Sequence, residues 1–368
     1  MRTPHKQILS LFLVGRYNAF SGASSRQLTG TENRMKATPL SPSPSCPPTW
    51  TIALALGLVY LSWGTTYFAI RAGVHTYHLP PALFGGTRVC LAGILLLAFL
   101  RLRGETIRLP RGEILTSGLG GLLLFVGGNG FINVAMDSVA SSVAGILVSS
   151  TPLWLALMET LWPGGEKLAT RGWLGLVMGM GGVLLLLAPR LDDPADFLRD
   201  LGPLFVLCST CAWALGSLVL RHRKRTGSHL TAAAYQMVLG GGALSIIGIG
   251  FGEGSHLTAE RLTFGAIGTF VYLLVVGSLI GFVAFNWLLG HVPAALVGTY
   301  AYVNPLVAIL IGWLLGGEDL TAEMIGGMVI ILLGVALVRG AVLQPRPALE
   351  TAALQDQSAY RETRLDII

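Results

Sequence analysis

Charged residues are scarce in this sequence. Asp, Glu, Lys and Arg together make up 12% of the 368 residues, whereas hydrophobic residues make up 52%. A soluble globular domain carries about 25% charged residues, so a chain this apolar has too little polar surface to stay dissolved in water. The composition excludes a soluble enzyme or regulatory domain and predicts an all-α polytopic membrane protein.

Sequence motifs for catalysis and metal binding are missing. We find no phosphate-binding glycine loop with its lysine, no HExxH zinc motif, no GxSxG nucleophile turn and no cysteine or histidine cluster at metal spacing. Cys208 and Cys211 lie inside an apolar run, which favours small packing residues over a metal or redox pair. We therefore expect no enzyme activity, no cofactor, no metal and no ATP-driven pumping by this chain alone.

The net charge of +6 has a membrane explanation. With the N-terminus placed inside, 20 Lys and Arg residues fall on the cytoplasmic side and three fall outside, namely Arg190, Arg199 and Arg261. Because basic residues collect in cytoplasmic loops, we expect both termini in the cytoplasm and no nucleic-acid partner.

Residues 1–50 differ from the rest of the chain. They are basic and rich in Ser, Thr and Pro, and the apolar patch Ile8–Val14 is too short to cross a bilayer. We interpret them as a disordered cytoplasmic tail. A signal peptide is the second interpretation, and a true start at Met35 is the third, which mass spectrometry of the N-terminus would test. Residues 339–368 form a second cytoplasmic tail.

Ten apolar segments lie between the tails, separated by linkers too short to hold a soluble domain. Each is close to the roughly 20 residues that an α-helix needs to cross about 30 Å of hydrocarbon. The segments are approximately 51–71, 80–100, 113–134, 138–161, 172–188, 201–220, 230–251, 263–288, 293–315 and 323–338.

One stretch occurs twice. Asn133–Leu153 aligns without a gap with Asn286–Leu306 at an offset of 153 residues, and each copy suggests a hairpin followed by a helix broken by proline. Downstream, Gly164–Leu186 aligns with Gly316–Val338 at an offset of 152, with nine identities in 23 positions. Shared apolarity alone does not explain that many identities, so the stretch belongs to a larger duplication.

The duplication divides the chain into two repeats of five spans, 51–188 and 201–338. Trp63 and Trp213 fall at equivalent places in them, at an offset of 150. A repeat with an odd number of spans enters the membrane from the opposite side the second time, so we predict inverted halves. Inverted repeats that alternate access around a central site are typical of secondary transporters.

Four stretches carry a family resemblance: Tyr60–Gly73, Pro80–Gly93, Ser150–Glu159 and Asn304–Thr321. Together they resemble the EamA family of the drug/metabolite transporter superfamily, over roughly residues 50–340. The resemblance implies ten spans, an inverted repeat and mostly export of small metabolites, including amino acids, their relatives and toxic compounds. These motifs indicate the family and are nearly silent on the substrate.

Arg88 is the one charge near the middle of a span. Its burial costs at least about 2.5–3.5 kcal/mol, so it should face the bundle interior or a wet cavity. It is a candidate to bind a substrate carboxylate. The alternatives are a structural ion pair, contacts with backbone carbonyls, or snorkelling to the outer surface. The second repeat has Met237 or Val238 there, and this asymmetry favours binding.

Further polar and aromatic residues inside the spans are candidates for cavity lining, with helix packing as the alternative for each. Asn129 and Asn133 lie four residues apart on one expected face of the third span, and Asn286 repeats the second of them. The complete candidate binding set is Trp63, Thr66, Tyr67, Arg88, Asn129, Asn133, Gln236, Asn286, Tyr300 and Asn304.

Pro152 and Pro305 each remove a backbone donor inside a span, so we expect kinks there, with a hinge as a secondary use.

A few titratable residues are candidates for a coupling proton. Glu159, Asp137 and His291 could each titrate, with solvation at a loop or interface as the alternative. Glu166 and Glu318 follow paired glycines, and we expect each to cap the next helix, where a carboxylate favours the N-terminal dipole.

These observations favour a secondary active exporter of a small metabolite in the cell's inner membrane. Its driving force would be proton exchange or the substrate gradient, and its partners would be the small-molecule substrate and the lipid bilayer. The sequence is also compatible with a homo-oligomer. A passive channel and an intramembrane enzyme are the competing interpretations, and the latter would need a buried acid pair or Ser–His pair, which is not visible.

Overall fold

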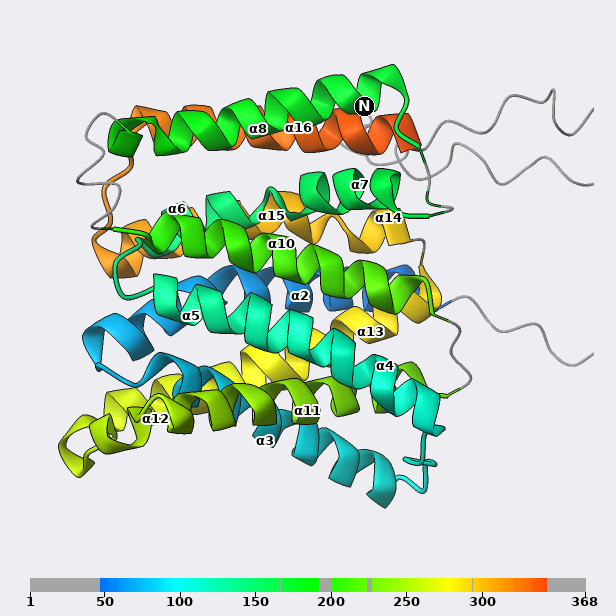
Figure 1. The fold of residues 1–368 in the computed structure, drawn as a ribbon, viewed down its shortest axis with the longest axis vertical. Helices are drawn as coiled ribbons and strands as arrows, with labels where there is room; N and C mark the ends of the chain where they lie inside the picture. The colour runs from blue at the N-terminus through cyan, green and yellow to red at the C-terminus, as the bar shows by residue number, and fades with distance from the viewer. Residues whose placement is uncertain are drawn as a thin grey trace, which may run out of the picture. The chain divides into compact units, whose positions relative to one another are not determined.

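The apolar segments form helices because hydrocarbon offers no partner for a free backbone N–H or C=O. A computed structural model describes residues 47–163, 165, 167–191, 200–223, 227–292 and 294–342, and these contain helices and no strand (Figure 1). The elements of the first half are α2 (Thr49–Arg71), the π-helical η1 (Ala72–Thr76), α3 (Pro81–Leu102), α4 (Arg111–Gly121), the π-helical η2 (Leu122–Gly130), α5 (Phe131–Ala135), α6 (Ser141–Val148), α7 (Thr151–Leu161) and α8 (Thr170–Leu191).

The second half repeats this order. Its elements are α10 (Gly202–Arg221), α11 (His229–Gly250), the short 3₁₀ turns η3 (Glu253–His256) and η4 (Ala259–Arg261), α12 (Phe264–Tyr272), the π-helical η5 (Leu273–Ile280), α13 (Gly281–His291), α14 (Ala294–Val297), α15 (Tyr300–Gly316) and α16 (Ala322–Val342).

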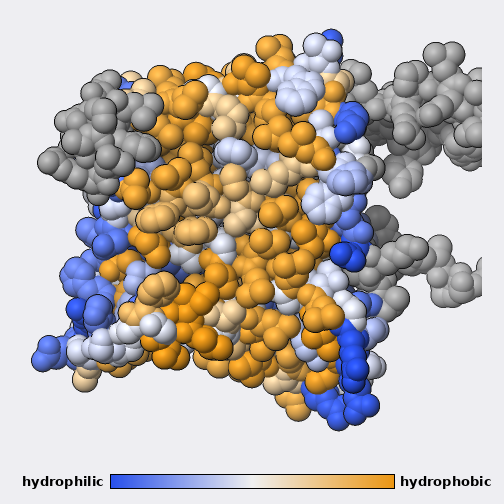
Figure 2. All heavy atoms as spheres, viewed as in Figure 1, coloured by the Kyte–Doolittle hydropathy of each residue, from blue (hydrophilic) through white to orange (hydrophobic). Residues whose placement is uncertain are grey.

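Nine helices in the described part of the chain are long and apolar enough to cross a membrane. Apolar side chains cover the middle of the visible face, and hydrophilic ones gather at the two sides where the helices end (Figure 2). This confirms the predicted polytopic membrane protein. The ninth predicted segment, 293–315, differs: it is divided into α14 and the 17-residue α15.

The packing of α8 on α16 shows that the repeats are inverted. These helices lie side by side at one edge of the bundle (Figure 1). A Cβ added at Gly175 would lie 2.7 Å from the Gly334 carbonyl oxygen, and one at Gly182 would lie 2.9 Å from that of Gly327. Gly175 and Gly327 occupy equivalent positions in the two repeats, and so do Gly182 and Gly334. Exchanging the repeats therefore converts each of the two contacts into the other. Such reciprocal contacts between antiparallel helices are the mark of a two-fold axis.

Both repeats contain a π-helical segment at the same place. In the first repeat η2 lies between α4 and α5, and in the second η5 lies between α12 and α13. The glycines Gly128 and Gly281 are repeat mates, and they pack against Trp213 and Trp63 respectively. π-Helical turns are rare overall but occur often at functional sites. The sequence did not predict them.

The proline-containing spans are interrupted differently in the two repeats. Pro152 lies in the first turn of α7, after the break at Ser149–Ser150. Pro305 lies inside α15, and the break there comes earlier, between α14 and α15. The use of either proline as a hinge remains a prediction.

Candidate functional site

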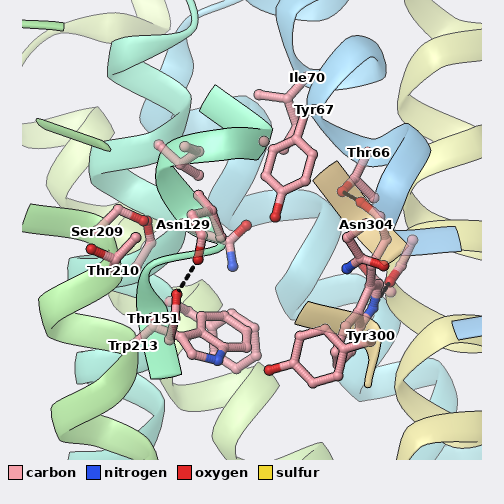
Figure 3. Close-up of a pocket in the computed structure, with 18 of the residues that line it drawn as sticks. Thr66, Tyr67, Ile70, Asn129, Thr151, Ser209, Thr210, Trp213, Tyr300 and Asn304 are labelled. Atoms are coloured by element: carbon pink, nitrogen blue, oxygen red, sulfur yellow. Dashed lines mark hydrogen bonds between the residues drawn. The ribbon is translucent and has the colours of Figure 1, made fainter. Parts of the chain in front are cut away.

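A cavity lies inside the bundle, and both repeats contribute to its wall. In Figure 3, Ser209, Thr210 and Trp213 of α10 lie across the cavity from Tyr300 and Asn304 of α15. Seven of the ten candidates from the sequence line it, together with Pro305: Trp63, Thr66, Tyr67, Arg88, Asn129, Tyr300 and Asn304.

Arg88 of α3 is the one charged residue among those described along this wall. It is 4% exposed, so it does not snorkel to the surface. Its Nη2 donates to Asn129 Oδ1 at 2.9 Å, and its Nη1 donates to Ser278 Oγ at 3.2 Å. Asn129 lies in η2 and Ser278 in η5, so the two π-helical segments hold the guanidinium from opposite repeats.

The charge of Arg88 is solvated by neutral groups alone within the described part of the chain. No described carboxylate forms an ion pair with it, and its Nε has no hydrogen-bond partner. A buried charge without a counter-ion is costly. The site is therefore suited to an anion entering the cavity.

Asn304 presents the complementary group. It is 5% exposed, and its Oδ1 accepts no hydrogen bond among the residues described. Buried polar atoms in native proteins are nearly always paired. Arg88 and Asn304 both line the cavity, and each has one buried polar atom without a described hydrogen-bond partner: Arg88 Nε, a donor, and Asn304 Oδ1, an acceptor.

Aromatic rings form another part of the wall. The Trp63 ring lies 5.0 Å from Phe285 and meets Tyr300 edge-on at 5.1 Å, measured between centroids. In the other repeat, Trp213 meets Phe125 edge-on at 6.3 Å. The Trp63 indole N–H donates to the Gly277 carbonyl at 3.3 Å, which fixes the ring against η5. Such rigid surfaces suit the apolar body of a small ligand.

Three candidates lie away from this cavity, so we remove them from the site. Asn133 is fully buried and packs against Gly85 of α3. The Asn286 amide donates to the Phe282 carbonyl of its own helix at 2.8 Å. Gln236 is 4% exposed and lies in the contact of α11 with α4, where its carbonyl packs on Gly121.

Several hydroxyl residues and one tryptophan of the wall were not predicted from the sequence. The hydroxyls of Ser149 and Thr210 donate to carbonyls three residues earlier in their own helices. Hydroxyls inside an apolar span that bond in this way look like packing groups. Trp213 could have been found, because it is the repeat mate of Trp63. The missed lining residues are Ser149, Thr151, Ser209, Thr210, Trp213 and Ser278.

The titratable candidates lie outside the cavity wall. Glu159 is buried near the end of α7, where its Oε1 lies 2.9 Å from His222 Nε2. Asp137 and His291 are exposed. No group of three or more His, Cys, Asp or Glu side chains in the described segments is arranged to hold a metal.

Glu318 does not cap the helix that follows it. Its carboxylate instead accepts hydrogen bonds from the backbone N–H of Ser141 and of Ser142, at 2.7 and 2.9 Å, and from both hydroxyls. Burial raises the pKa of Glu318, but these four hydrogen bonds outweigh burial and leave that pKa below its ordinary value. The start of α16 is capped instead by Thr321, whose Oγ1 accepts a hydrogen bond from the Met324 N–H at 3.3 Å. Glu166 lies outside the described residues.

Comparisons with known proteins agree with this architecture. The model of the EamA-like transporter family matches residues 49–188 and 200–340. The chain is 35% identical over 307 residues to the "Uncharacterized inner membrane transporter YedA" of Escherichia coli, a match that covers 83% of this chain and 96% of YedA. It is 24% identical to a "Probable amino-acid metabolite efflux pump" of Salmonella typhimurium, with 75% and 91% covered. A solved crystal structure that is 20% identical shares the fold, with a TM-score of 0.56 and coverage of 78% and 97%.

Proposed function

Because this chain belongs to the EamA-like transporter family and is a multi-pass membrane transporter, we propose that it is a secondary active exporter of small carboxylate-bearing metabolites. The substrate binds in the central cavity, and the two inverted repeats open that cavity to one side of the membrane at a time. The cell's inner membrane is the site of action, with both termini in the cytoplasm, as the distribution of basic residues favours.

The observation that carries the proposal is Arg88. It is a cationic side chain in a wall that contributes no described carboxylate, and its Nε is unpaired. A carboxylate is the group that a guanidinium binds best, through parallel N–H···O bonds. Neutral and cationic solutes gain nothing from this charge, so the site discriminates against them.

The remaining polar and aromatic groups narrow the substrate class. Asn304 Oδ1 offers an acceptor for an N–H group, and the rings of Trp63, Trp213 and Tyr300 offer flat apolar walls. A carboxylate, an N–H donor and a small apolar body occur together in amino acids and their close relatives. The name of the Salmonella relative points to the same class.

The test is transport by purified protein in liposomes. Preloaded unlabelled substrate should accelerate uptake of labelled substrate, because a carrier exchanges whereas a passive channel does not. Candidate substrates come from comparing metabolites released by overexpressing and deletion cells. If no carboxylate-bearing compound shows exchange while a neutral or cationic one does, the proposed substrate class is wrong.

Arg88→Lys is the matched variant for the anchoring role. It keeps the positive charge but loses the planar fork, so uptake should fall less than in Arg88→Ala, with membrane insertion unchanged in both. Equal transport by wild type and Arg88→Ala would show that the carboxylate is bound elsewhere.

A further inference from the structure

Two arginines occupy equivalent ends of the two repeats. Arg71 is the last residue of α2, and Arg221 is the last residue of α10, at the same offset of 150 that relates Trp63 to Trp213. Each reaches a glutamate of the other repeat: Arg71 pairs with Glu318, and Arg221 pairs with Glu159. Because the repeats are inverted, these two pairs lie at opposite ends of the bundle. We call them the Arg71 end and the Arg221 end.

At the Arg71 end, one carboxylate joins three segments. Arg71 Nε lies 3.7 Å from Glu318 Oε1, and the Glu318 side chain is 8% exposed. The same carboxylate accepts the hydrogen bonds from Ser141 and Ser142 at the start of α6. Arg71 also donates to the Val139 carbonyl just before α6. The end of α2, the start of α6 and the segment after α15 are thereby tied together.

At the Arg221 end, the carboxylate of Glu159 has two basic partners. Its Oε2 lies 3.5 Å from Arg221 Nη1, and its Oε1 lies 2.9 Å from His222 Nε2. The Glu159 side chain is 8% exposed. The His222 ring stacks on Trp162 at 5.5 Å with an interplanar angle of 13°. The end of α7 in the first repeat is thereby tied to the end of α10 in the second.

The two pairs bracket the cavity along the chain. Arg71 directly follows Ile70, which lines the wall at that end. Toward the other end, Arg221 lies eight residues beyond the lining residue Trp213, and Glu159 lies eight beyond Thr151. Eight helical residues span about 12 Å. The Arg71 pair therefore lies next to the cavity wall, whereas the Arg221 pair lies well beyond it.

We infer that the two cross-repeat pairs act as positioning residues that close the cavity at either end. This inference rests on the proposed alternating access. Opening one end requires the repeats to separate there, which breaks the pair at that end while the other pair holds. Removing the Arg71 pair therefore favours the state open at the Arg71 end, and removing the Glu159 pair favours the opposite state. The opposite sign of the two effects is what distinguishes positioning residues from ordinary structural ion pairs.

The experiment reads accessibility and needs no substrate. A reporter cysteine replaces Thr210 in a variant whose four native cysteines are changed to alanine, and a membrane-impermeant thiol reagent is added to sealed vesicles of either orientation. Arg71→Gln should raise labelling from the Arg71 end about fivefold relative to labelling from the Arg221 end. Glu159→Gln should shift the same ratio about fivefold in the other direction.

Two controls complete the test. Arg71→Lys, which retains the charge, should restore most of the wild-type ratio, and the exposed Arg108→Gln should leave it unchanged. Equal shifts in one direction, or no shift in either variant, would overturn the assignment of these residues. Failure of alternating access itself gives a different result. In a channel, the reporter cysteine of the protein that keeps both pairs would be labelled from both faces at full rate.

Discussion

The two repeats place different residues at equivalent points of one cavity wall. In the first repeat α3 carries Arg88, and in the second α11 has Met237 or Val238 at that point. Both Arg88 and Met237 line the cavity. The partners that hold Arg88 come one from each repeat, Asn129 from η2 and Ser278 from η5.

This difference separates scaffold from chemistry. The features that both repeats share are structural: the glycine contacts of α8 with α16, the π-helical segments, and a tryptophan packed on each. The charge has no counterpart in the second repeat, which supplies the unpaired Asn304 acceptor instead. A duplicated bundle can thus keep its helix packing symmetric while the polar groups of its cavity wall diverge.

Moving the charge between the repeats should have the largest effect. Met237→Arg places a cation at a 1% exposed position inside an apolar cluster that includes Phe125, Leu274 and Phe282, at a cost of at least about 2.5–3.5 kcal/mol. We expect little folded protein by size-exclusion chromatography in detergent, whereas Met237→Leu should fold normally. Arg88→Met should fold as well as wild type yet lose at least about tenfold in uptake of carboxylates. If Met237→Arg folds and Arg88→Met does not, the positions have the opposite roles.

Placing a carboxylate of the protein beside Arg88 should have the next largest effect. Asn129→Asp places a carboxylate where Asn129 Oδ1 now lies, 2.9 Å from Arg88 Nη2. An internal ion pair would then compete with the substrate and repel its carboxylate, so uptake should fall at least about tenfold. Ser278→Ala removes only the 3.2 Å hydrogen bond and adds no charge, so its loss should be about fivefold or less. Undiminished uptake by Asn129→Asp would place the anion site away from Arg88.

The span pattern was predictable because helix formation in hydrocarbon depends on local composition. The interruption of the ninth span was not predictable, because it depends on a contact with a residue far along the chain. Arg339 of α16 donates to the Gly298 carbonyl at 2.6 Å, at the break between α14 and α15. No pattern within residues 293–315 indicates that partner.

The residue types of the site were predictable from the sequence, but which of these side chains face the cavity was only partly predictable. Asn129 and Asn133, four residues apart, were expected on one face of a helix. Asn129 lies in η2 and Asn133 in α5, so the end of the π-helical segment falls between them. A π-helix has more residues per turn than an α-helix, and this change in register leaves Asn129 on the cavity and Asn133 against Gly85. Periodicity based on 3.6 residues per turn cannot detect that rotation.

The equivalence of the scaffold can be tested at the two glycines that face the tryptophans. A Cβ at Gly128 would lie 2.9 Å from the Trp213 ring, and one at Gly281 would lie 2.7 Å from Trp63 Nε1. Gly128→Ala and Gly281→Ala should therefore each lower the free energy of unfolding by about 1–3 kcal/mol. Thermal unfolding in detergent would measure both, with Gly57→Ala as the control because its Cβ meets nothing within 4 Å. A harmless change at one site and a costly one at the other would show that the repeats pack differently here.

The smallest expected effect concerns the Arg71 end, where Glu318 has no described equivalent. Hydrogen bonds from Ser141 and Ser142 hold the pKa of Glu318 below the ordinary 4.5 in the folded protein. A carboxylate with a lowered folded pKa adds stability that is fully present above its unfolded pKa and is lost as pH falls through the folded value. The difference in melting temperature between wild type and Glu318→Gln should therefore stay constant from neutral pH to about pH 5 and shrink below 4.5. The exposed Glu105→Gln should show no such dependence. A difference that instead grows as the pH falls would mean that the folded state favours the protonated carboxyl, contrary to the hydrogen bonds that α6 donates.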